Sequence, residues 1–101
     1  MIYCTAEFKA KPGKEEELFK VLQALEIPTH KEKGCIQYKV MRKKENQYAP
    51  GVHYGILFNE IWESIEIFEK HCNMPYITEF FEKECLSEDG LVEKFNVNIF
   101  E

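Results

Sequence analysis

Basic residues are in the minority in this chain, and long hydrophobic runs are absent. Thirteen lysines and arginines stand against 18 aspartates and glutamates, for a net charge of -5, which argues against a surface that binds nucleic-acid phosphates. No run is long and apolar enough for us to expect a membrane span. The first residues carry no basic segment and soon reach Glu7 and Lys9, so we expect no secretory signal there.

Sequence signatures of bound metals, phosphates and disulfides are also lacking. No Cys-x-x-Cys pair, Gly-rich phosphate loop or Gly-x-Ser-x-Gly turn occurs, and neither His30 nor His53 has a Cys or His at ligand spacing, so no metal or cofactor site is predicted. Widely spaced cysteines beside apolar positions predict buried, reduced thiols in a cytoplasmic protein. They are Cys4, Cys35, Cys72 and Cys85.

Hydrophobic periodicity gives the expected secondary structure. Strands are predicted at Ile2–Ala10, Cys35–Arg42, His53–Trp62 and Leu91–Phe100. Helices are predicted at Lys14–Lys31, at Ile65–Cys72, and at a segment that Asn73 caps, that Pro75 opens and that extends to Cys85. Pro28 is expected to kink or divide the first helix near Ala24. In the second strand, Ile36 is expected to share a face with Tyr38 and Val40.

The order β-α-β-β-α-β over residues 1–101 predicts one α+β domain with a ferredoxin-like arrangement. Its single antiparallel sheet would be covered by helices on one side. The other face carries apolar and aromatic residues, so we expect it to pack against the same face of a second copy in a homodimer.

The only Trp lies just before a helix that carries a His. Strand alternation places Phe58, Glu60 and Trp62 on one face, and Ser64 is a good N-cap for the helix that carries His71. These side chains can meet in the gap between sheet and helices. A flat aromatic wall beside a titratable imidazole suits an aromatic substrate.

Several motifs together resemble the antibiotic-biosynthesis monooxygenase (ABM) family over nearly the whole chain. They are Pro12-Gly13-Lys14, Pro28-Thr29, Gly34-Cys35-Ile36-Gln37-Tyr38, and Glu60-x-Trp62-Glu63-Ser64 followed by His71 and Pro75. The chain most resembles the small quinol-monooxygenase-like members. This resemblance implies a dimeric α/β barrel of ferredoxin-like protomers, each with its own pocket between sheet and helices. It also implies a cytoplasmic setting and oxidation of phenols or quinols by O2 without flavin, haem or metal.

Some positions depart from other branches of that family. Members that oxidise antibiotic precursors carry Asn, Tyr and Arg where this chain has Phe58, Phe68 and Glu82, so their pocket is not expected here. Phe8 and Phe81 stand where the haem-degrading branch uses Asn and an axial His, which disfavours haem degradation.

A cofactor-free oxygenase needs a base and a dry cavity around its substrate. His71 is the candidate base, since many quinol-type relatives carry a second His where this chain has Tyr76. Glu60 would raise the basicity of His71 if the two touch, and Tyr76 could orient a substrate oxygen. The expected walls around the substrate ring are Trp62, Phe58 and Phe80.

Other readings of the same residues stay open. His71 and Trp62 also fit plain core packing, and Glu60 fits an exposed strand end or an ion pair with a lysine. The same fold with His71 moving protons suits an isomerase or epimerase of a small polar keto compound. A third hypothesis is a non-catalytic dimeric protein that binds an aromatic or haem-like ligand.

Overall fold

Four strands and the helices between them follow the chain in the predicted order. The computed structural model describes all 101 residues. The strands are β1 (Ile2–Ala10), β2 (Cys35–Arg42), β3 (Ile56–Trp62) and β4 (Val92–Phe100). The helices are α1 (Glu15–Thr29), α2 (Ile65–Cys72) and α3 (Pro75–Phe80), and α3 continues into a π-helical turn, η1 (Phe81–Cys85). The predicted ferredoxin-like βαββαβ fold is confirmed.

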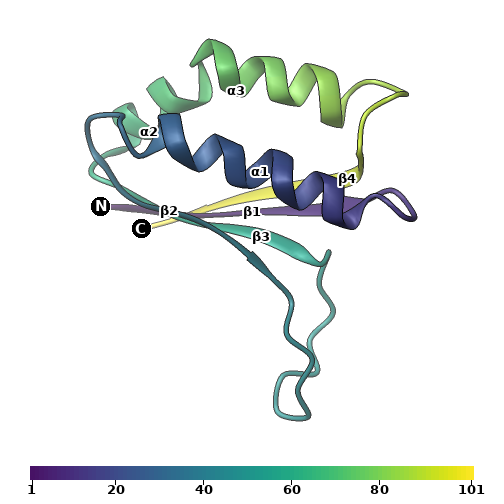
Figure 1. Cartoon of the computed structure of the whole chain (residues 1–101). Helices are drawn as coiled ribbons and strands as arrows, with labels where there is room; N and C mark the ends of the chain where they lie inside the picture. Colours follow the sequence, from purple (N-terminus) through teal and green to yellow (C-terminus); the bar gives the residue numbers. More distant parts are fainter.

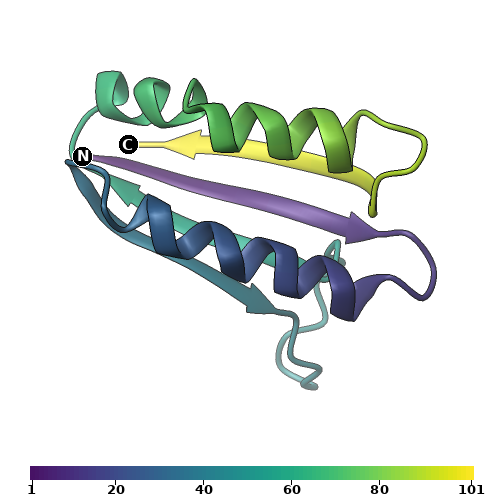
Figure 2. The same cartoon turned by 45° about the horizontal axis from the view of Figure 1, so that its top comes forward.

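The strands form one antiparallel sheet in the order β2-β3-β1-β4. All the helices lie over one face of this sheet (Figure 1). Figure 2 shows α1 above the β2 side and the α2–α3 run above the β4 side. The two termini lie together because Tyr3 of β1 pairs with Phe100 of β4. A two-layer domain therefore holds its core, and any internal cavity, between the sheet and the helices.

Alternation along β1 decides which side chains enter that core. Cys4, Ala6 and Phe8 point toward the helices and are buried, whereas the residues between them face the other side of the sheet. On α1, Leu18 and Leu22 are one turn apart and are fully buried against this layer. The largest fully buried side chain is Trp62.

Contrary to the prediction, helix α1 is not divided at Pro28. It runs without a break from Glu15 to Thr29 and has Pro28 as its penultimate residue. The missing N–H of a proline removes a single bond, to the carbonyl four residues earlier, and the helix ends one residue later. The amide of His30 still donates to the carbonyl of Glu26, at 3.0 Å. The chain then turns without forming a second helical segment.

Three smaller predictions also need correction. Ile36 does not share the buried face of Tyr38, because the register with β3 shifts between Cys35 and Gln37, and a bulge turns the extra side chain outward. Strand β3 begins at Ile56 rather than His53. The N-cap of α3 is Met74, while Asn73 instead ends α2.

Residues 43–55 connect β2 to β3 as a long arm. This arm leaves the sheet on the side away from the helices (Figure 1). Two of its apolar side chains, Tyr48 and Val52, are almost fully exposed. None of the helices has the length and apolar character that crossing a membrane requires.

Candidate functional site

A cavity of about 380 Å³ lies between the sheet and the helices. Its floor is the helix-facing side of the sheet, and its roof comes from α1, α2, α3 and η1. The floor residues are Cys4, Ala6, Phe8, Tyr38, Phe58, Glu60 and Val97. The roof residues are Leu25, Phe68, His71, Cys72, Ile77, Thr78, Phe80, Phe81, Glu82 and Leu86. Its size and apolar lining are those of a small-molecule site.

Glu60 is the buried carboxylate on the cavity floor. The indole Nε1–H of Trp62 donates to its Oε1 at 3.0 Å. Burial raises the pKa of Glu60 to about 7, although the hydrogen bond from Trp62 acts in the opposite direction. At neutral pH this group therefore exists as both acid and carboxylate, so it can accept or donate a proton within the cavity.

His71 forms the roof directly above Trp62. The two rings lie 4.5 Å apart between centroids, and Nδ1 of His71 is 2.9 Å from Oε2 of Glu32. Burial lowers the pKa of His71, and the hydrogen bond to Glu32 partly offsets this. A neutral imidazole that donates from Nδ1 to a carboxylate leaves Nε2 as a proton acceptor.

The free nitrogen of His71 opens onto accessible space. No buried side-chain nitrogen or oxygen in the protein lacks a hydrogen-bond partner, and the only bond of the imidazole is the one at Nδ1. Nε2 is therefore not enclosed, and His71 is a lining residue of the cavity. Its free lone pair is available to a ligand there.

Glu32 is a site residue that sequence reasoning missed. The hydroxyl of Tyr76 donates to Oε2 of Glu32, and Thr29 Oγ1 lies 3.1 Å from the same hydroxyl. Glu32 lies in the turn between α1 and β2, where no periodicity marks it. The nearest signal is Gly34, whose φ of 86° closes that turn against α2 in a conformation that glycine adopts readily.

The cavity brings together four of the six predicted site residues. His71, Glu60, Phe58 and Phe80 line it. Trp62 lies behind this lining, because it is fully buried beneath His71 and Glu60. Tyr76 does not line the cavity, and its hydroxyl contacts Glu32 and Thr29 instead. Neither Trp62 nor Tyr76 is a lining residue of the cavity.

Thiols at this site stay protonated at neutral pH. Cys4 and Cys72 both line the cavity. Burial raises the pKa of Cys72 to about 11 and raises that of Cys4 still further, so neither carries the thiolate that nucleophilic chemistry requires. No three His, Cys, Asp or Glu side chains are grouped closely enough to hold a metal ion.

Comparisons with known proteins agree with this architecture. A protein from Shewanella oneidensis is 31% identical, with 98% of this chain and 87% of that one covered and a TM-score of 0.77. A conserved protein from Methanosarcina mazei Go1 is 26% identical, with 99% and 90% covered and a TM-score of 0.78. A structure described as an antibiotic biosynthesis monooxygenase shares the fold at 19% identity, with 100% and 97% covered and a TM-score of 0.73.

Curated proteins offer no match to this chain. The family model of the antibiotic biosynthesis monooxygenases, in contrast, matches residues 1–83. That range includes β1 to β3, α2 and α3, and therefore most of the cavity lining. The chain belongs to the antibiotic biosynthesis monooxygenase family.

Proposed function

We propose that this protein is a cofactor-independent monooxygenase that oxidises a phenol or quinol with O2. The observation that carries the proposal is that Glu60 and His71 line the same, mostly apolar cavity. A phenolic substrate must lose a proton before it can pass electrons to oxygen. One of these groups would accept that proton, while the aromatic walls exclude water.

The reaction balances without a further electron donor. Nε2 of His71 takes the phenolic proton, and the phenolate gives one electron to O2. The resulting phenoxyl radical and superoxide combine at a ring carbon into a peroxide. Cleavage of its O–O bond leaves one oxygen on the ring as a quinone carbonyl and releases the other as water, with the ring C–H proton lost. Neutral Glu60 is the proton donor to the departing oxygen.

Oxygen uptake tests this proposal. Purified, metal-stripped protein is given a panel of quinols, and O2 consumption is compared with autoxidation in the same buffer. His71→Ala should slow uptake by about 100-fold, because it removes the general base. The matched control, His53→Ala, lies in the arm outside the cavity and should be unaffected. Uptake no faster than autoxidation would reject the proposal for that panel.

Two proton-accepting groups in one cavity also favour a second candidate, an isomerase or epimerase of a small keto compound. Glu60 and His71 would then exchange a carbon-bound hydrogen with solvent, so deuterium would enter the substrate from D2O without oxygen consumption. A non-catalytic binding protein predicts a third result, in which His71→Ala leaves the function intact.

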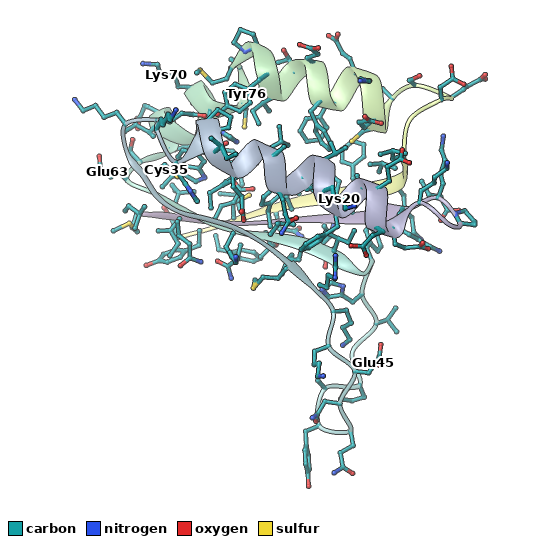
Figure 3. All side chains as sticks on the ribbon, in the orientation of Figure 1. Lys20, Cys35, Glu45, Glu63, Lys70 and Tyr76 are labelled. Carbon is teal, nitrogen blue, oxygen red and sulfur yellow. The ribbon has the colours of Figure 1, made fainter.

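The proposal includes a homodimer in a reducing compartment such as the cytoplasm. The uncovered sheet face carries half-exposed Tyr3 and Phe100 together with partly buried Leu57 and Ile61, which suits a self-complementary contact. The arm that carries Glu45 projects from this side (Figure 3) and would flank the partner. Ile61→Asp should yield monomers in light scattering, whereas Ile27→Asp on α1 should not.

The four cysteines are unpaired, which fits a reducing setting.

A further inference from the structure

Glu60 and His71 lie at one end of the cavity, whereas the other polar lining residues, Thr78 and Glu82, come from α3 and η1 of the roof. Tyr38 of β2, Glu60 of β3 and Cys4 of β1 face one another in a single row across the sheet. The ring of His71 stands 5.2 Å from that of Tyr38, between centroids. The cavity's free imidazole nitrogen and its buried carboxylate therefore both lie toward β2 and β3.

The next row across the sheet is apolar and has a gap in its middle. Phe58 of β3, Ala6 of β1 and Val97 of β4 are aligned there. Ala6 has the smallest side chain of the three, so the floor is lowest between two larger neighbours. Phe80 and Phe81 are two of the aromatic side chains of the roof. This apolar channel starts beside Glu60 and leads toward β4.

Exposure shows where the cavity opens. Tyr38, Glu60 and His71 are each only 4% exposed, so these polar groups lie deep in the cavity. Val97 is 41% exposed and Leu86 is 70% exposed, although both line the same cavity. The mouth therefore lies along β4, facing α3 and η1, whose lining residues Thr78 and Glu82 are also exposed. A ligand that enters with its polar group first leaves its other end at Val97 and Leu86.

We infer that the ligand is a phenol with an unbranched apolar substituent opposite its hydroxyl, which extends over Ala6 to the mouth at Val97 and Leu86. This inference rests on the proposed function, since it places the phenolic oxygen at Glu60 and His71. Strands β3 and β4 are two inter-strand spacings apart, about 10 Å. A single ring covers only part of that distance, and a chain of several methylenes fills the remainder.

Binding of phenol and a series of 4-n-alkylphenols tests the inference without any turnover. Trp62 is the only Trp and lies against Glu60 and His71, so its fluorescence reports occupancy of the polar end. Affinity should rise roughly fourfold for each added methylene, the effect of burying one CH₂ group, and should level off once the chain reaches Val97. Affinity that does not change with chain length would overturn the inference, as would equal affinities for 2-hexylphenol and 4-hexylphenol.

Variants separate the channel from general hydrophobic adsorption. Ala6→Val fills the floor and should weaken 4-hexylphenol binding about tenfold, or about 1.4 kcal/mol, while phenol binding stays nearly constant. Leu86→Glu, at an exposed position, tests the mouth without disturbing the core. Ile27→Glu on α1 is its matched control, because Ile27 is 66% exposed and lies outside the cavity lining. If Leu86→Glu and Ile27→Glu weaken binding equally, the mouth is not at Leu86.

The two proposals fail separately. A chain-length gradient without oxygen uptake would retain the ligand class and reject the oxygenase. Oxygen uptake with short quinols, together with no chain-length gradient, would retain the oxygenase and reject the apolar substituent.

Discussion

Replacing Glu60 with Gln should make the protein more stable at alkaline pH. The carboxylate is buried and accepts a hydrogen bond from Trp62, and burial raises its pKa from 4.5 to about 7. At about 1.4 kcal/mol for each pKa unit, the charged form costs the folded state about 3 kcal/mol. Glutamine keeps the acceptor oxygen for Trp62 and carries no charge, so it avoids this cost.

The sign of the pH dependence follows from the raised pKa. Between pH 4.5 and about 7 the folded chain holds a proton on Glu60 that the unfolded chain has lost, so the contribution of Glu60 to stability falls as the pH rises. The advantage of Glu60→Gln should therefore be near zero at pH 4.5 and reach about 3 kcal/mol at pH 8.

Urea unfolding followed by Trp62 fluorescence, in the presence of a reductant, measures this difference. Glu63→Gln is the matched control, because Glu63 is exposed just after β3 and should give no difference at either pH. Equal stabilisation by Glu60→Gln at pH 4.5 and 8 would refute the argument from burial. The same variant should lose oxygen uptake, which would make Glu60 a residue retained for activity at the expense of stability.

Three further substitutions test the packing around the site. Tyr76→Phe removes the hydroxyl that donates to Glu32 and should cost about 1–2 kcal/mol in urea unfolding; an unchanged midpoint would contradict the hydrogen-bond network. Phe58→Ala should cost about 3 kcal/mol, at the low end for a core aromatic because the ring borders the cavity. Ser64→Ala removes the α2 cap, whose Oγ accepts from the Ile67 amide, and should lower the free energy of unfolding by about 1 kcal/mol in thermal melts.

Local sequence patterns predicted the helices and strands well, because strand alternation and helix capping depend on residues close together in the chain. Alternation placed β1 at its observed bounds, and Ser64 caps α2 as predicted. The failures have separate causes. Pro28 removes one hydrogen bond from the end of α1, which stays continuous to Thr29, and the bulge that turns Ile36 outward arises from pairing with β3.

The candidate site was predictable only in part. Strand and helix periodicity indicated the side on which Phe58, Glu60 and His71 lie, and all three line the cavity. Periodicity could not distinguish the cavity wall from the layer behind it, where Trp62 lies. It also gave no reason to connect His71 with Glu32, which is 39 residues away along the chain.

The sequence by itself determined the order of elements, their buried faces and the family, because hydrophobic period, capping residues and short motifs act within a few residues of one another. Only the tertiary structure decided which polar groups share one enclosed volume, that the mouth lies along β4, and that burial brings the pKa of Glu60 to about 7. Desolvation and hydrogen bonding depend on everything packed around a group, and that surrounding comes from segments far apart in the chain.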